Sequence, residues 1–476
     1  MTIVRTSASI VLAFAIAACG GGGSSSGGGP IAGGGGGVGG GTGACSLSER
    51  QQFVKDVADE WYLFPDLLDN DVNPADFSDL QSYIDALVAP ARAESKDRGF
   101  SYITSIEEEN ALINSGANAG FGVLLGYDTV NNRVFVIDAY ENAPGLGAGL
   151  DRGTELLAIG TTSTDLVTVS TLMASGGPRA VIDALGPSDP GVTRVIQFRT
   201  AADLTSEASI TKAEFAVDPI SDRFGVKIFN DGGKKVGYLH LRTFIVRTAS
   251  DQLRDAFGQF QTDGVTEIII DLRYNGGGLV SVADLMGDLM GAGRIGQVFS
   301  ETVLRDSKAD EAPDPELFES EANAIMPTKI AFIGRGGTAS ASELVANSMI
   351  PYLGANTALI GTNTFGKPVG QYAFDLDACD DRLRLVTFKT NNADGQGEYF
   401  EGLADVFPNT CRANDDIFTQ FGDPSEASIS VALDFLAGRS CSAISGTLRT
   451  AQRVEGREIL QPSRPNAVQH RIPGLF

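Results

Sequence analysis

The sequence predicts an α/β protein that contains several domains. Its 476 residues are enough for two or three domains, and 42% of them are hydrophobic, which is ample for large cores. From Ser206 onward, apolar runs of strand length alternate with helical segments, a pattern typical of a sheet flanked by helices. A helical pattern precedes this region, and a Gly-rich, strand-like pattern lies between the two.

The N-terminal part of the folded body, residues 46–112, is expected to be a helical segment. Ser48 and Gln51 fit a capping box at the start of a first helix. Trp61, the only tryptophan, is expected to pack in the core of this segment. A second helix is expected over Phe77–Leu87.

Residues 206–445 are expected to form a core of βα repeats. Several apolar runs lack alternating polar positions, as is usual for parallel strands buried on both faces. The expected strands are Lys235–Phe244, Thr266–Leu272, Lys329–Ile333 and Thr357–Gly361, and the expected helices are Ser250–Phe260, Val280–Met290, Ser340–Met349 and Ser428–Gly438.

Ser342 is the candidate nucleophile. A buried strand, Lys329–Ile333, precedes it, and a Gly-rich turn leads from that strand to a helix that begins near the serine. Helix N-termini offer free N–H groups and partial positive charge, which can stabilise an oxyanion. For this serine considered alone, a helix-capping role is the simpler interpretation.

The general base is harder to assign, because the chain has only two histidines. His470 lies in a polar tail, so a Ser–His pair has one candidate, His240, in a strand-like run. A lysine can replace histidine where burial lowers its pKa enough for the neutral amine to exist. Lys367 lies in a Gly-rich loop between Phe365 and Val369, which makes it the favoured base.

Three motifs together resemble those of the carboxyl-terminal processing, or tail-specific, serine peptidases. In that family the second serine of the first motif is the nucleophile, the lysine is the general base, and the glutamine four residues later orients the lysine. Carried over, these residues are Ser342, Lys367 and Gln371. The motifs are Thr338-Ala339-Ser340-Ala341-Ser342-Glu343, Phe365-Gly366-Lys367 with Gln371, and Asp271-Leu272-Arg273-Tyr274-Asn275-Gly276-Gly277-Gly278.

The resemblance also implies an oxyanion hole. One amide of Gly277 or Gly278 and the amide of Glu343 would supply its donors. Asp271 and Arg273 are expected to fix the glycine loop rather than to touch substrate. The alternative is that the glycines form only a tight turn.

Residues 113–205 resemble a PDZ domain. Their opening glycines would let backbone N–H groups converge on a terminal carboxylate, and the adjoining edge strand would pair with the peptide. The alternative is a Gly-rich hairpin without a ligand. The carboxylate loop would consist of Gly120, Phe121, Gly122 and Val123.

The N-terminus indicates export. An apolar run, Ile10–Ala18, is too short to span a bilayer and ends in Cys19, which resembles the end of a bacterial lipoprotein signal. Residues 1–18 would be the signal peptide, Cys19 the lipidated residue, and residues 19–45 a flexible Gly/Ser tether. The alternative is an ordinary signal peptide. The expected location is the cell envelope, with a lipid anchor in the membrane and the folded body facing the periplasm or exterior.

Four further cysteines suggest two disulfides in an exported protein. Three pairings are possible, and Cys379–Cys411 with Cys45–Cys441 is favoured; free thiols are the alternative. The spacing of the cysteines does not suit a metal site, so neither a metal nor another cofactor is expected.

Charge and motifs together lead to a functional prediction. The formal net charge of −24 disfavours nucleic-acid binding. The favoured function is an exported serine endopeptidase that recognises protein or peptide C-termini. An alternative of another class is an idle, PDZ-bearing lipoprotein that binds or scaffolds peptides without cutting them.

Residues 446–476 are polar and are expected to form a loosely packed tail.

Overall fold

A six-stranded sheet organises the C-terminal half of the computed structural model, which describes residues 45–445 and 457–476. Five of its strands are parallel, and one antiparallel strand forms a hairpin at the edge. In spatial order the strands are β10 (Val226–Asp231), β11 (Lys234–His240), β12 (Glu267–Asp271), β15 (Lys329–Gly334), β16 (Thr357–Gly361) and β19 (Thr410–Arg412).

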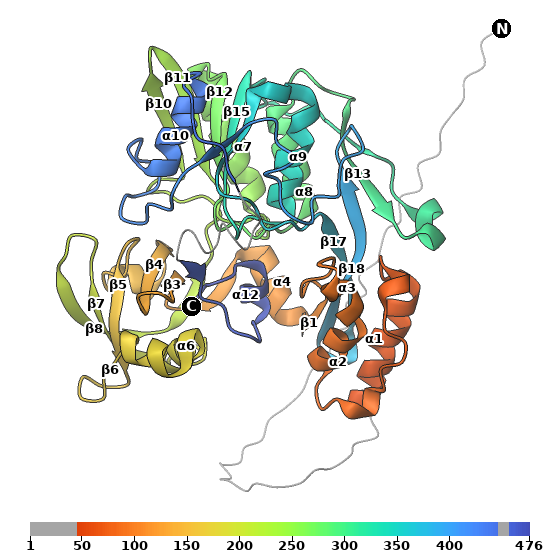
Figure 1. Cartoon of the computed structure of the whole chain (residues 1–476), viewed down its shortest axis with the longest axis vertical. Helices are drawn as coiled ribbons and strands as arrows, with labels where there is room; N and C mark the ends of the chain where they lie inside the picture. The colour runs from red at the N-terminus through yellow and green to blue at the C-terminus, as the bar shows by residue number, and fades with distance from the viewer. Residues whose placement is uncertain (1–44, 446–456) are drawn as a thin grey trace, which may run out of the picture. The chain divides into compact units, whose positions relative to one another are not determined.

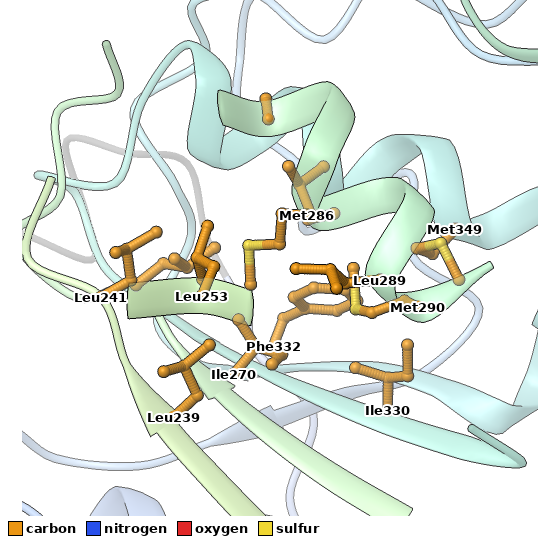
Figure 2. Packing of buried hydrophobic residues seen from close by; sticks show 14 of the residues in the cluster. Leu239, Leu241, Leu253, Ile270, Met286, Leu289, Met290, Ile330, Phe332 and Met349 are labelled. Carbon is orange, nitrogen blue, oxygen red and sulfur yellow. The ribbon is translucent and has the colours of Figure 1, made fainter. Parts of the chain in front are cut away.

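Helices cover both faces of this sheet (Figure 1). The helices on one face are α7 (Ala249–Asp263), α8 (Val280–Met290) and α9 (Ala341–Leu353), and α10 (Ala427–Leu436) packs on the other. Alternate strand residues point to opposite faces: Ile270 and Phe332 pack against the three helices (Figure 2), whereas Ile269 packs against α10. Burial on both faces explains why these strands lack alternating polar residues.

A second sheet joins the N-terminal helices to this core. Its long central strand, β18, pairs along one side with β17 and along the other with β1 and β13. The helices pack against it through a separate apolar cluster that includes Val369 and Leu385. These strands are β1 (Tyr102–Ser105), β13 (Val298–Leu304), β14 (Glu316–Leu317), β17 (Val369–Leu376) and β18 (Asp381–Asn391); the helices are α1 (Leu47–Trp61), α2 (Leu80–Leu87) and α3 (Ala89–Ala93).

Residues 113–205 contribute most of a third, antiparallel sheet, on which α6 (Val169–Leu185) packs. Helix α4 (Ile106–Ser115) precedes this region, and β2 (Ala117–Gly120) pairs with β9 (Ala213–Ala216) beside it. In order, the strands of the third sheet are β20 (Glu458–Ile459), β3 (Val123–Asp128), β4 (Arg133–Ala139), β5 (Glu155–Gly160), β7 (Thr193–Arg199) and β8 (Thr205–Thr211), with β6 (Val167–Thr168) beside β5.

The α/β multidomain class is therefore confirmed, and the helix expected over Val280–Met290 has those bounds. The capping box was misplaced: Ser46 and Glu49 form it, and α1 begins at Leu47. The second helix begins at Leu80 rather than Phe77, because the Asp79 side chain accepts the Ser82 N–H and caps it there.

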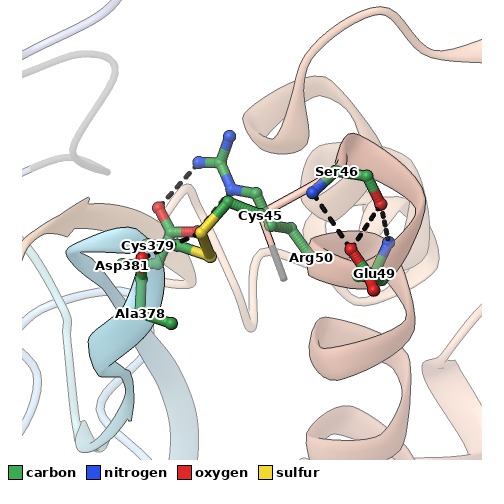
Figure 3. Close-up of a disulfide and its surroundings, with 7 residues drawn as sticks. All are labelled: Cys45, Ser46, Glu49, Arg50, Ala378, Cys379 and Asp381. Atoms are coloured by element: carbon green, nitrogen blue, oxygen red, sulfur yellow. Dashed lines mark hydrogen bonds and ion pairs between the residues drawn. A yellow bond between two sulfur atoms is a disulfide. The ribbon is translucent and has the colours of Figure 1, made fainter. Parts of the chain in front are cut away.

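The predicted disulfide pairing is wrong. The structure links Cys45 to Cys379 and Cys411 to Cys441, not Cys379 to Cys411 and Cys45 to Cys441. Cys379 lies in the turn between β17 and β18, beside the start of α1, where Arg50 also forms an ion pair with Asp381 (Figure 3). Cys411 instead lies in β19 within the first sheet, and the chain returns past it after α10.

The prediction of a loosely packed tail is also wrong for residues 457–476. This segment forms β20 and α12 (Ala467–Arg471), and Leu460, Leu475 and Phe476 are buried. Residues 446–456 lie outside the described residues, as do the predicted signal peptide 1–18, Cys19 and nearly all of the tether 19–45. The described residues all belong to one compact unit, and none of their helices is long and apolar enough to cross a bilayer.

Replacing Phe332 tests the two-sided packing of the first sheet. Phe332→Ala is expected to lower the free energy of unfolding by about 3–5 kcal/mol, because it leaves a cavity between β15 and the helices. Urea denaturation followed by circular dichroism measures the change. Phe418→Ala is the matched control, since that ring is 55% exposed. Equal losses in the two variants would contradict the assigned packing.

Candidate active site

Two loops meet at the carboxyl edge of the first sheet. Residues 272–279 follow β12, and residues 335–340 follow β15; because these parallel strands are neighbours, both loops emerge at the same edge. Hydrogen bonds join them: the Thr338 hydroxyl donates to the Leu272 carbonyl at 2.8 Å, and the Ala339 N–H donates to the Asn275 carbonyl at 3.1 Å. Helix α9 then begins, with Ser342 as its second residue.

Buried charges hold the first loop in place. The Arg273 guanidinium lies between the carboxylates of Asp271 and Glu426, at 2.7 Å from each, and none of the three side chains is exposed. Paired, planar contacts of this kind fix orientation as well as charge. Asp271 and Arg273 therefore support the loop, in line with the sequence-based expectation.

The Ser342 hydroxyl is fully buried and faces the 272–279 loop. Its Oγ donates to the Asn275 carbonyl at 3.0 Å. The turn before it is tight, with Ser340 at a φ of +58°. A Cβ on Gly277 would lie 2.7 Å from the Ser340 Cβ, so only glycine allows the two loops to pack this closely.

A third loop, residues 362–368 after β16, is fixed to α9 by the side chain of Glu343. This buried carboxylate accepts hydrogen bonds from the Thr364 hydroxyl at 2.6 Å, from the Gly366 and Lys367 N–H groups at 2.7 Å each, and from the Ser340 N–H at 3.1 Å. Burial raises the pKa of Glu343, while these donors favour the ionised form. The main chain of Lys367 is thereby bonded to the side chain of Glu343, which directly follows the candidate nucleophile in the sequence.

The Lys367 side chain is half-buried and lines a large cavity. Its Nζ donates to the Gln371 Oε1 at 3.0 Å and lies 4.9 Å from the centre of the Phe100 ring. Gln371 in turn donates to the Phe100 carbonyl. Burial, and next the positive charge of Arg471, lower the pKa of Lys367 to about 7. A substantial fraction of this amine is therefore neutral near pH 7.

The structure brings Lys367 and Gln371 together, but it does not join Ser342 to Lys367. Within residues 45–445 and 457–476, no hydrogen bond connects the serine Oγ to the lysine Nζ, and each has another partner. Lys367 lines a cavity of about 870 Å³ that also borders Gly276 and Gly337, beside the buried serine. In this structure the Ser342 hydroxyl therefore faces the Asn275 carbonyl and not the Lys367 amine.

The predicted oxyanion donors lie around this serine. The Gly277 N–H donates to the Asn275 Oδ1 at 2.9 Å, so it is engaged within its own loop. Gly278 has a φ of +146° and abuts Ile245, and Glu343 lies in the first turn of α9. Their role as oxyanion donors stays a prediction.

Comparison with known proteins finds a family that part of the chain resembles. Residues 235–405 match the model of peptidase family S41. This region contains the glycine loop, Ser342, Lys367 and Gln371, whereas residues 113–205 and 457–476 lie outside it.

S41 relatives match the chain at low identity. It is 25% identical over 280 residues to the chloroplastic C-terminal processing peptidase of Tetradesmus obliquus, a match that covers 55% of this chain and 54% of that protein. It is 24% identical over 326 residues to the carboxyl-terminal-processing protease of Synechocystis sp., which covers 68% and 70%. The chain spans about half the length of the first curated relatives it matches.

A solved structure shares the fold. The crystal structure of a putative S41 protease from Bacteroides fragilis NCTC 9343 has a TM-score of 0.62 and 23% sequence identity, and the match covers 81% of this chain and 97% of that one.

The remaining predicted site residues lie elsewhere in the chain. The His240 ring is buried and stacked on Phe421 at 4.2 Å, and neither ring nitrogen has a hydrogen-bond partner among the described residues. Burial lowers the pKa of His240 well below its usual value, so this ring is neutral. The Gly120–Val123 loop precedes and begins β3, where the N–H groups of Gly122 and Val123 donate to the Phe476 carbonyl.

The carboxylate of Glu343 is the functional element that the sequence analysis missed, since only its amide had been assigned a role. A signal was present, because an acid three residues after Ser340 fits the second half of a capping box. Among the described residues, no cluster of three or more His, Cys, Asp or Glu could hold a metal ion.

Glu343→Gln tests the anchoring of the third loop. A glutamine offers one carbonyl oxygen and places an NH₂ group among hydrogen-bond donors, so the free energy of unfolding is expected to fall by about 1–3 kcal/mol. Amide hydrogen exchange at Gly366 and Lys367 is expected to accelerate. Glu398→Gln, at an exposed ion pair with Lys389, is the control. Unchanged exchange in Glu343→Gln would refute the anchor.

Proposed function

We propose that this protein is an exported serine endopeptidase that cleaves peptide bonds with a Ser342–Lys367 dyad. The observation that carries the proposal is the hydrogen bond from the main chain of Lys367, whose pKa is lowered, to the carboxylate of Glu343, the residue after Ser342, within the region that matches family S41. The names of the relatives, C-terminal processing peptidases and proteases, support the same class of reaction.

The chemical steps follow from these groups. The Ser342 Oγ attacks the peptide carbonyl carbon while neutral Lys367 accepts the hydroxyl proton. The resulting oxyanion is stabilised by the amide of Glu343 together with that of Gly277 or Gly278. The C–N bond then breaks, and the Lys367 ammonium returns a proton to the leaving amine. Water, activated by the same lysine, hydrolyses the acyl-enzyme ester and releases the second product.

Gln371 is proposed to position the lysine. Its Oε1 accepts from Nζ while its own amide is held by the Phe100 carbonyl, so the amine has one defined direction.

Export and a lipid anchor are part of the proposal. The signal-like residues 1–18 and Cys19 support them, and two disulfides suit an oxidising compartment such as the periplasm. Residues 113–205 are proposed to act as a PDZ domain that recognises protein or peptide C-termini. Within residues 113–205, β3 is the outermost strand on the side where strand addition would occur, and in this structure β20 pairs with it.

Replacing the dyad residues tests the proposed chemistry. Ser342→Ala and Lys367→Ala are each expected to reduce cleavage of an unfolded protein with an apolar C-terminus by roughly 10³-fold or more. Gel-resolved cleavage by protein that lacks residues 1–44 measures the rates, and Lys235→Ala, an exposed lysine, is the matched control. Undiminished cleavage by Ser342→Ala would leave only the idle, peptide-binding alternative. A Ser–His mechanism would instead require activity to survive Lys367→Ala and to be lost in a His240 variant.

The pH dependence tests the state of the base. Because Lys367 must be neutral to accept a proton, the single-turnover rate is expected to rise with pH through the lysine pKa of about 7. The rate of chemistry should therefore increase about tenfold per pH unit below this pKa and level off above it. A profile that is flat from pH 5 to 9, with chemistry shown to be rate-limiting, would contradict the proposed base.

A further inference from the structure

Residues 457–476, here called the C-terminal segment, lie along the free edge of β3. Strand β20 pairs antiparallel with this edge, with Glu458 opposite Tyr127 and Ile459 opposite Gly126. The end of the segment pairs with the other half of the same edge, where Leu475 lies opposite Leu124. Both pairings are antiparallel, so the segment adds β20 and one isolated bridge to the edge of the third sheet.

The last residues of the segment contact the predicted carboxylate loop. The Gly122 N–H donates to the Phe476 carbonyl at 2.8 Å, the Phe476 N–H donates to the Val123 carbonyl at 3.0 Å, and the Leu125 N–H donates to the Gly474 carbonyl at 2.9 Å. A Cβ on Gly120 would lie 2.7 Å from the Phe476 carbonyl carbon. This is the geometry of a peptide added as a strand to a sheet edge, with its final residue at the glycine loop.

The Phe476 side chain is buried in the core of this region. It is 2% exposed and belongs to the same apolar cluster as Phe121, Leu125 and Met173. Main-chain bonds and one apolar pocket are the two features by which an extended peptide is recognised at a sheet edge. The segment therefore occupies the β3 edge as a ligand would.

The same segment lies against both loops that flank Ser342. A Cβ on Gly276 would lie 3.2 Å from the Arg471 carbonyl oxygen and 3.3 Å from the Pro473 Cδ. A Cβ on Gly337 would lie 2.8 Å from the Ile459 Cδ1. Residues of the segment also line the cavity that contains Lys367, so they occupy space that a substrate needs.

Polar contacts hold the segment to the N-terminal part of the chain. The Arg471 guanidinium forms two hydrogen bonds with the buried Glu109 carboxylate of α4, at 2.7 and 3.0 Å. The His470 ring stacks on Tyr102 at 3.7 Å. These contacts, together with the engaged Ser342 hydroxyl, describe a closed and resting site.

We propose that the C-terminal segment is a built-in competing ligand that keeps the peptidase closed. It occupies the β3 edge and covers the catalytic loops, and a substrate whose C-terminal end is apolar must displace it before cleavage. The inference rests on the proposed function. Because the segment belongs to the chain, its effective concentration at the groove is on the order of millimolar or higher, and a free peptide binds with an affinity reduced accordingly.

Peptide binding without catalysis tests the competition. In a Ser342→Ala background, a fluorescent peptide with the sequence of residues 471–476, Arg-Ile-Pro-Gly-Leu-Phe, is titrated by anisotropy. Adding Phe476→Asp places a charge in the apolar pocket and releases the segment, so the peptide is expected to bind at least tenfold more tightly. Val130→Asp, 80% exposed in the β3–β4 turn, is the matched control. Equal affinities with and without Phe476→Asp, in folded protein, would overturn the proposal.

Hydrogen exchange gives a second test that needs no change in the segment. In Ser342→Ala protein, millimolar peptide is expected to raise exchange at the Leu460 and Phe476 amides while Gly122 and Val123 stay protected. Unchanged protection of residues 457–476 would show a permanent structural strand and overturn the proposal.

Activity separates this inference from the proposed function. With an active dyad, Phe476→Asp is expected to raise the initial cleavage rate several-fold over the unaltered chain. Absence of cleavage in both proteins would refute the proposed chemistry, yet the binding and exchange results would still decide whether the segment competes. Equal, measurable rates in both would refute the inhibitory role of the segment while leaving the peptidase assignment intact.

Discussion

The carboxylate of Glu343 is the interaction on which the site depends. Four donors from two loops converge on a side chain that burial alone would favour in its neutral form. Without it, the 362–368 loop would lose its hydrogen bonds to α9 and would keep only bonds to other parts of the chain, such as the one from the Phe365 N–H to the Thr338 carbonyl at 2.9 Å. The region that matches family S41 thus has a structural acid next to the proposed nucleophile, and this acid holds the proposed base through main-chain bonds rather than by touching either reactive atom.

The proposed closed state also depends on hydrogen bonds within the site, here those made by Asn275. A buried hydroxyl needs a partner, and the Asn275 carbonyl supplies one for Ser342 while the C-terminal segment covers the loop. The Asn275 side chain likewise accepts the Gly277 N–H, a candidate oxyanion donor. One asparagine therefore engages both the nucleophile and a donor, and opening the site requires the 272–279 loop to exchange these internal bonds for bonds to substrate.

Much of the core could be predicted from sequence because its signals are local. Buried parallel strands such as Glu267–Asp271 are continuous apolar runs, and the helix Val280–Met290 has clear periodicity. The disulfide pairing could not be predicted, because it depends on where Cys45 and Cys411 meet the rest of the fold. The docked segment was missed for a related reason. The segment pairs with β3 through main-chain groups, and because every residue carries these groups, the pairing leaves no signal in the sequence. The polar composition of the segment therefore suggested a loose tail.

The C-terminal segment affects the pKa of Lys367, because it helps to keep water away from the lysine amine. A neutral amine near pH 7 requires that Lys367 be kept from water, and the segment contributes walls to its cavity and the positive charge of Arg471 nearby. Displacing the segment removes both influences, and each removal raises the pKa of the lysine and disfavours the neutral base. A substrate that displaced the segment and left the lysine open to water would therefore lower the fraction of neutral lysine that the proposed reaction needs. An extended apolar polypeptide resolves part of this conflict, because it excludes water from the lysine as it displaces the segment, and burial then again favours the neutral amine.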